Sequence, residues 1–189
     1  FFGGLASSTA VVGTMLDHVR QRPEAASYGV AAILLADAAM AVRNLAIALA
    51  FTLPSGRPVL YGAVLPLGAV ILGSVAIAAY AADWTEEVEM DLESPFSLRN
   101  ALGFGAIFLL VIAGGAVDQQ QFGSAGFYVT AILSGLVSSA GATSSAVLLY
   151  MGGTIDHQTS VFGILLATAS SIVVKAALTL SAPNRSFSY

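Results

Sequence analysis

Residues 26–53 read ASYGVAAILLADAAMAVRNLAIALAFTL, an almost unbroken apolar run. A helix that crosses a bilayer needs about 20 mostly apolar residues, because it must cover about 30 Å of hydrocarbon. Only two residues of the run, Asp37 and Arg43, are charged. The run therefore predicts a membrane-spanning helix that carries two ionisable side chains.

The composition of the whole chain agrees with this interpretation. Of its 189 residues, 57% are hydrophobic and only 10% are charged, whereas soluble domains have about 25% charged residues. So few charges cannot cover a surface in water, which excludes soluble enzyme folds, and so many apolar residues exclude a disordered chain. The net charge is −4 and the seven basic residues are scattered, which argues against nucleic acid as a partner.

Five further apolar stretches accompany the first and are separated by clusters of turn-forming residues. Because every backbone N–H and C=O group in hydrocarbon must be hydrogen-bonded internally, we expect these stretches to be helices. The prediction is an all-α fold, a polytopic membrane bundle of about six transmembrane helices that forms a single domain over residues 1–189. The predicted spans are Phe1–Leu16, Ala26–Leu53, Pro58–Ala81, Leu98–Val117, Ala125–Met151 and Thr159–Ala182.

The chain also contains an internal repeat. When it is shifted by 131 residues, residues 3–49 lie on residues 134–180 with identities at 13 of 47 positions. The motif Gly-Leu-x-Ser-Ser begins at Gly4 in the first copy and at Gly135 in the second. Because four spans, an even number, separate the matching helices, we expect a parallel repeat whose copies enter the membrane from the same side. The first span is short, so we also expect the sequence to be a fragment of a longer chain.

Hydroxyl side chains gather on the helices that carry this motif. Ser7 and Thr14, for example, are seven residues apart and share a helix face. Two interpretations remain open. Small residues let helices pack tightly and hydroxyls bond across them, or the hydroxyls line a polar path where helices broken at glycine contact a passing ion or solute. The candidates for such a lining are Ser7, Ser8, Thr14, Ser138, Ser139 and Ser145.

Polar and ionisable residues within the spans form a second set of candidates. A charge at mid-membrane costs about 2.5 to 3.5 kcal/mol even on the most lenient scale, so it needs a partner or water. Asp37 and Asn44 share one helix face. Thr168, Ser171 and Lys175 share another, and the repeat matches the two faces. We predict that Asp37 and Lys175 neutralise each other, directly or through the polar side chains beside them, either as a structural ion pair or as a switchable charge on a translocation path.

No catalytic motif accompanies these residues. The sequence contains no HExxH, no Gly-x-Ser-x-Gly and no phosphate-binding loop, and the absence of cysteine excludes disulfides and thiolate metal sites. The segment Asp83–Glu93 carries six acidic residues and no basic one, but its spacing matches no defined metal site. We therefore predict no enzymatic activity, no catalytic residue, no metal site and no cofactor.

Four short motifs occur in this order along the chain: GGLASSTA at residues 3–10, SPFSLRNAL at 94–102, SGL at 134–136 and ASSIVVKA at 169–176. Together they resemble the C-terminal membrane domain of unknown function of bacterial MgtC/SapB-family proteins, and the resemblance covers nearly the whole chain. It implies an MgtC-like helical domain upstream, and the family name suggests magnesium without assuring transport. The family tends to have an acidic residue just after the second Gly-Leu motif, whereas this chain has Ser138-Ser139-Ala140-Gly141 there. No role of that acid is therefore carried over.

These observations favour a transporter or channel-like domain for a small ion or solute, with a link to magnesium as the resemblance implies. The alternative is a non-transporting membrane subunit that regulates or scaffolds a partner complex. The expected location is the bacterial cytoplasmic (inner) membrane, which the chain crosses several times. The expected partners are the lipid bilayer and either a second copy of the chain or a membrane complex, and not nucleic acid.

Overall fold

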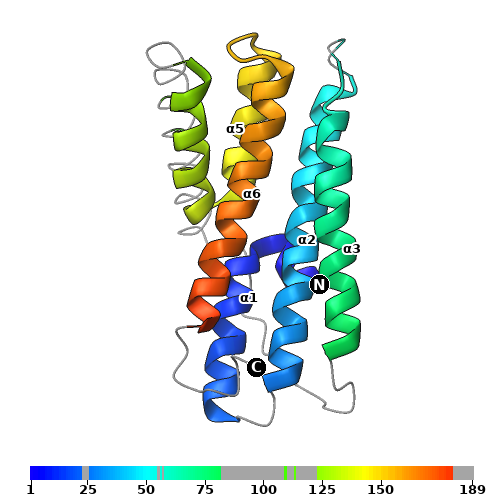
Figure 1. Ribbon diagram of the computed structural model, residues 1–189, viewed down its shortest axis with the longest axis vertical. Helices are drawn as coiled ribbons and strands as arrows, with labels where there is room; N and C mark the ends of the chain where they lie inside the picture. Colours follow the sequence, from blue (N-terminus) through cyan, green and yellow to red (C-terminus); the bar gives the residue numbers. More distant parts are fainter. Residues whose placement is uncertain are drawn as a thin grey trace. The chain divides into compact units, whose positions relative to one another are not determined.

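The computed structural model describes residues 1–22, 26–54, 56, 58–81, 109, 113 and 123–180. Within these residues all regular secondary structure is helical, which confirms the predicted all-α class. Small and aliphatic residues fill the helices, and a helix satisfies its own backbone polar groups in hydrocarbon. The helices are α1 (Phe2–Gln21), α2 (Ala26–Thr52), a 3-10 turn (Tyr61–Ala63) that leads into α3 (Val64–Ala81), a helix over Gly123–Val137, α5 (Ser139–Met151) and α6 (His157–Leu180) (Figure 1).

Three of the described helical segments are long and apolar enough to cross a membrane, namely Ala26–Thr52, Tyr61–Ala81 and His157–Leu180. They coincide with the second, third and sixth predicted spans. The first predicted span falls on α1, which is interrupted at Ser7 and is not among the three. The fourth, Leu98–Val117, lies almost wholly outside the described residues and stays a prediction.

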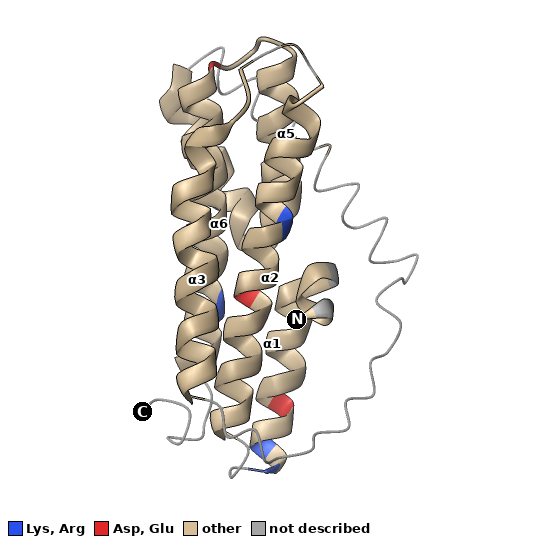
Figure 2. Cartoon of the chain, turned by 90° about the vertical axis from the view of Figure 1, so that its right-hand side faces the viewer, with Lys and Arg blue, Asp and Glu red and all other residues tan. Residues whose placement is uncertain are grey.

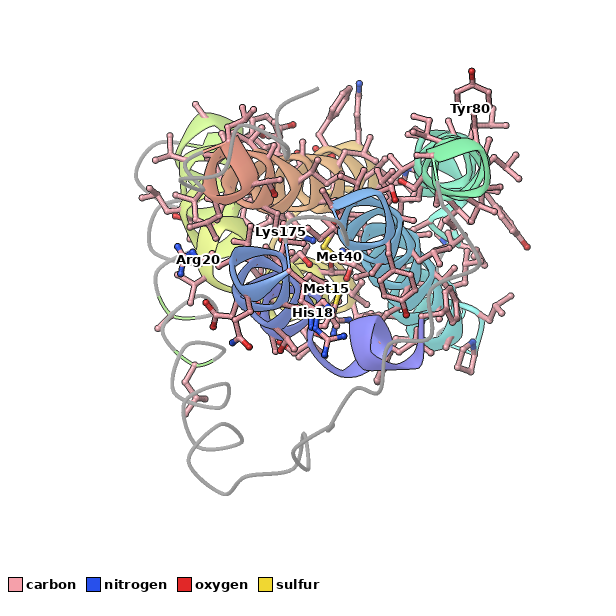
Figure 3. The ribbon with its side chains drawn as sticks, turned by 90° about the horizontal axis from the view of Figure 1, so that it is seen from below. Met15, His18, Arg20, Met40, Tyr80 and Lys175 are labelled. Carbon is pink, nitrogen blue, oxygen red and sulfur yellow. The ribbon has the colours of Figure 1, made fainter. Side chains whose placement is uncertain are left out.

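Large apolar side chains on α3 face outward. Leu65, Leu72 and Ile77 are exposed, and Tyr80 is 95% exposed and points outward from α3 (Figure 3). Charged residues are sparse on the described helices (Figure 2). Such a surface is unfavourable in water and favourable against lipid tails, which is consistent with a membrane protein.

The described helices divide into two compact units, each of which contains one helix break. The first unit holds α1, α2 up to Val42, most of α3 and α6 from Val173. The second unit holds α2 from Arg43, the helix over Gly123–Val137, α5 and α6 up to Ile172. Each unit therefore contains part of α2 and part of α6. The single domain over residues 1–189 stays a prediction.

Within the second unit the helix over Gly123–Val137 runs parallel to α6. Near its beginning the hydroxyl oxygens of Ser124 and Thr159 lie 3.2 Å apart. Near its end Gly135 packs against Ala167, which lies further along α6. Later residues of this helix therefore meet later residues of α6.

α5 runs antiparallel to α6, so the chain turns back at Ser138. The Ser160 hydroxyl near the start of α6 donates to the carbonyl oxygen of Ala146 in α5 (3.2 Å). At the end of α5 the ring of Tyr150 lies 6.0 Å, centroid to centroid, from that of His157, the first residue of α6. α5 and the helix before it therefore form a hairpin whose two arms both pack on α6.

α2 and α6 also run in opposite directions (Figure 1). Asn44 within α2 donates to Thr168 in the middle of α6 (3.0 Å). The segment that follows α2 lies at the start of α6, where the carbonyl oxygen of Val59 is 3.3 Å from Nε2 of His157. α2 and α6 are the matching helices of the two predicted copies, so the prediction that the copies run parallel is wrong.

One physical feature explains this error. The fifth predicted span, Ala125–Met151, is not one helix but the hairpin that reverses at Ser138. A hairpin enters and leaves the membrane on the same side, so it does not cross the membrane. One of the four spans counted between the matching helices is therefore not a crossing, and the number that remains is odd. The hairpin arms are as apolar as a spanning helix, and hydropathy alone does not distinguish the two.

Candidate functional site

Two helices are interrupted at serine residues that lie 131 positions apart. Ser7 within α1 has φ −155° and ψ 101°, and Ser138 directly before α5 has φ −155° and ψ 104°. The Ser7 hydroxyl accepts a hydrogen bond from the N–H of Ala10 (3.3 Å). The Ser138 hydroxyl accepts one from the N–H of Gly141 (3.2 Å). Serine suits an N-cap because its oxygen satisfies a free N–H of the first turn, which is why the breaks fall at serine and not, as expected, at glycine.

A glycine three residues before each break brings two backbones into close contact. A Cβ atom at Gly4 would lie 2.6 Å from the Cα of Ala36 in α2. A Cβ atom at Gly135 would lie 2.6 Å from the Cα of Ala167 in α6. Real Cβ atoms do not approach a backbone this closely, so only glycine fits at either position. Both glycines therefore face protein.

In the first unit a lysine ammonium group lies beside the break. Lys175 of α6 is 1% exposed, and its Nζ donates to Oγ of Ser8 (3.0 Å), the residue after the break. Nζ also forms an ion pair with the carboxylate of Asp37 on α2. The sulfur of Met40 lies 3.1 Å from Nζ, and Figure 3 shows Lys175 and Met40 side by side between the helices. We call Ser8, Asp37 and Met40 the ammonium cradle.

The predicted contact between Asp37 and Lys175 is therefore confirmed. A lone charge in hydrocarbon is unfavourable, and a buried pair is stable only where its remaining polar atoms are also hydrogen-bonded. The Ser8 hydroxyl provides one such bond to the ammonium group. The pair links α2 to α6 within the first unit and holds a positive charge directly beside the break in α1.

The matching positions in the second unit carry a neutral pair. Asn44 is fully buried, and its Nδ2 donates to Oγ1 of Thr168 (3.0 Å). The Thr168 hydroxyl donates in turn to the carbonyl oxygen of Ile164 (2.9 Å), so it can only accept from Asn44. This arrangement fixes the orientation of the amide. It leaves Oδ1 of Asn44 buried without a hydrogen-bond partner among the described residues, and Oγ1 of Thr143 on α5 is buried in the same way.

Comparison with known proteins places the chain in a family. Residues 1–182 match the family model described as "Domain of unknown function (DUF4010)". The chain belongs to this family. An "Uncharacterized protein" of Aquifex aeolicus (strain VF5) is 33% identical over 86 residues, which make up 46% of this chain and 37% of that protein. The match thus spans well under half of the relative, and no solved structure matches the chain.

Two of the predicted lining residues of this DUF4010 chain bond to their own helices. Thr14 donates to the carbonyl oxygen of Ala10 (3.0 Å), and Ser145 donates to that of Gly141 (2.9 Å). A hydroxyl that donates to the preceding turn of its own helix is satisfied without a ligand. Thr14 and Ser145 therefore donate to their own helices and not to either polar pair.

Two other predicted residues, Ser139 and Ser171, are buried in the second unit of the DUF4010 chain.

One contact residue of Lys175, Met40, is not among the residues predicted from the sequence, because its side chain is apolar. The only signal was its position three residues after Asp37, on the same face of α2.

Among the described residues no group of three or more His, Cys, Asp or Glu side chains could hold a metal ion, and the acidic segment Asp83–Glu93 lies outside them.

Proposed function

We propose that this DUF4010 domain carries a small ion or solute across the bacterial inner membrane, as a multi-pass transport domain without enzymatic activity. The observation that carries the proposal is the pair of helices interrupted at Ser7 and Ser138. Directly after the first break Ser8 bonds to the buried Lys175, and just before the second break Gly135 packs against α6. A break leaves N–H and C=O groups without intrahelical partners, which is unfavourable in lipid. In secondary transporters, discontinuous helices use these groups to bind substrate and coupling ions near the bilayer midplane.

The opposite directions of α2 and α6 support the same proposal. Many transporters consist of two copies of inverted topology, and one copy moves against the other around a central binding site. We propose that residues 3–49 and 134–180 are such inverted copies. The matched breaks and the matched glycine contacts are the features that support this relationship.

In this proposal Lys175 and Asp37 provide the switchable charge. While the pair is dry, each group neutralises the other. If the contact opens to water on one side, a proton can leave the ammonium group or reach the carboxylate, and the charge of the site changes. The ammonium group repels a divalent cation from the cradle, so a link to Mg²⁺ and to the MgtC/SapB family is supported by the sequence resemblance alone.

Flux into proteoliposomes tests this proposal. Vesicles that contain the chain and entrapped indicators for protons, alkali cations and Mg²⁺ should show flux above that of empty vesicles. Lys175→Met and Asp37→Asn should abolish it. Arg20→Met and Asp17→Asn are matched controls, because these two residues form an exposed ion pair in α1, and they should leave the flux unchanged.

The regulatory alternative predicts a different result. A subunit that only scaffolds a complex would show no flux for any of these ions, and a stable partner would co-purify with it from the native membrane. Equal flux through the wild-type chain and the Lys175→Met variant would contradict the role of the ion pair while leaving transport itself standing.

A further inference from the structure

We propose that the second unit contains a binding site for a monovalent alkali cation, formed by Asn44, Ser139, Thr168 and Ser171. All four residues are buried. The 131-residue offset that relates the two helix breaks also relates this set to the ammonium cradle and its lysine. The correspondences are Ser139 to Ser8, Thr168 to Asp37, Ser171 to Met40 and Asn44 to Lys175.

The backbone around the two sets supports the comparison. The breaks at Ser7 and Ser138 have the same φ, and their ψ values are 101° and 104°. The glycine before each break meets the matching alanine at the same distance, 2.6 Å. The residue after each break is therefore held in an equivalent place relative to α2 in one unit and α6 in the other.

The two sets differ in what occupies their centre. In the first unit the ammonium group of Lys175 is a cation bound by the oxygens of Ser8 and Asp37. In the second unit the lysine is replaced by Asn44, whose side chain is shorter and neutral, so no side chain brings a cation. The sulfur of Met40 is replaced by the hydroxyl of Ser171, so every position of the second set carries an oxygen.

Asn44 provides the independent sign of a missing ligand. Its Oδ1 is buried and has no hydrogen-bond partner among the described residues. The amide cannot turn over to relieve this, because the Thr168 hydroxyl already donates to Ile164 and can accept only from Nδ2. Thr143 lies one turn after Ser139 on the same face of α5. Its Oγ1 is also buried and has no hydrogen-bond partner among the described residues. A bound cation would satisfy such lone pairs.

The chemistry of the set selects a monovalent cation. Its oxygens are hydroxyl and amide oxygens, and none of its four side chains is acidic. A divalent cation binds best to carboxylates, and neutral oxygens would leave its charge uncompensated in a low-dielectric site. An anion is disfavoured because the free atom of Asn44 is an acceptor. The helix over Gly123–Val137 ends at this break, and the carbonyl end of a half-helix favours cations.

Binding at this site does not require transport. That the bound cation is the transported or coupling ion rests on the proposed function, whereas the site itself does not. The experiment therefore measures binding and flux separately.

Radioactive sodium bound to the purified chain, measured by scintillation proximity, tests the site. Sodium, potassium and choline chloride compete at constant ionic strength. We expect saturable binding that sodium or potassium displaces and choline does not. Asn44→Leu should weaken binding roughly tenfold or more, and Asn44→Asp, which adds a carboxylate, should strengthen it by a similar factor. Ser160→Ala is the matched control, because this buried serine of α6 bonds to Ala146 in α5 and not to the set.

A transplant of the first pair into the second unit gives the sharpest test. The double variant Asn44→Lys with Thr168→Asp places an ammonium group and a carboxylate at the positions that match Lys175 and Asp37. It should keep its thermal stability without added cation and lose sodium binding, because its own ammonium group fills the site. Unchanged sodium binding in this variant would overturn the proposal.

Two further outcomes separate the site from the proposed function. If the wild-type chain shows no saturable binding of sodium or potassium, Asn44 holds at most a buried water molecule and the site proposal is wrong. If binding is present and lost in Asn44→Leu while no flux occurs in proteoliposomes, the site stands and only the transport proposal fails.

Discussion

Lys175 and Asp37 form an ion pair whose side chains are 1% and 9% exposed, although 138 residues separate them in the sequence. The pair connects α6 to α2 within the first unit, next to the break in α1. Both helices are long and apolar enough to cross a membrane. Each charge therefore depends on the other, because neither has water around it to replace its partner.

Removal of one partner of this pair should be more damaging than removal of both. Asp37→Asn or Lys175→Met alone leaves a buried charge uncompensated, which should destabilise the protein by about 3–5 kcal/mol. The double variant should recover part of the loss. Thermal unfolding in detergent of the two single variants and the double variant gives the coupling energy through a double-mutant cycle. Strictly additive losses would show that the two side chains do not stabilise each other.

The close contact at Gly135 predicts strong sensitivity to a methyl group. A Cβ atom there would lie 2.2 Å from Oγ of Ser170 and 2.6 Å from the Cα of Ala167. Gly135→Ala must push the hairpin away from α6, which should cost about 1–3 kcal/mol of unfolding free energy. Gly13→Ala is the control, because nothing lies within 4 Å of its Cβ position in α1, and alanine there should stabilise the helix by about 0.5–1 kcal/mol. Equal effects of the two substitutions would argue against the close approach.

The hairpin makes a prediction about membrane sidedness. Tyr150 donates to the carbonyl oxygen of Pro58 (2.7 Å), so the turn after α2 and the turn after α5 lie together within the second unit. Six consecutive spans would place these turns on opposite sides. Because the chain has no cysteine, single cysteines at Pro54 and Thr154 can be labelled with an impermeant maleimide in intact cells and in inverted vesicles. Both should react from the same side, and labelling from opposite sides would restore the six-span arrangement.

Asp156, in the turn before α6, should make stability depend on pH under acidic conditions. Its carboxylate accepts a hydrogen bond from the N–H of Thr159 (2.7 Å), and this bond lowers the pKa of Asp156 below its ordinary value of 3.8. A lowered folded-state pKa contributes stability above the unfolded value, and this contribution is lost as the pH falls through the folded pKa. The melting temperature should therefore decline below pH 3.8.

Asp156→Asn isolates this effect, because asparagine also caps helices but does not titrate. The difference in melting temperature between the wild-type chain and this variant should shrink as the pH falls below that value. A difference that stays constant with pH would show that the carboxylate does not stabilise α6.

The sequence by itself determined the membrane character, the all-helical class and the ion pair between Asp37 and Lys175. Long apolar runs allow little but helices in hydrocarbon, so α2, the segment Tyr61–Ala81 and α6 were predictable within a few residues. The contact between Asp37 and Lys175 was predictable because each charge needs a partner there, and the repeat placed them on matching faces. The glycines at close backbone contacts were predictable as well, because small residues are favoured where helices pack closely in a membrane.

Only the tertiary structure decided the direction of the helices and the state of the second polar pair. Ser138 reverses the chain through one extended residue, and a hydropathy profile averages over about twenty residues and reads both arms as one span. The unpartnered oxygen of Asn44 depends on which way the Thr168 hydroxyl points, which is fixed by its bond to the backbone of α6. A helix pattern determines the face on which a side chain lies, whereas the atoms that meet it are determined by how the helices pack.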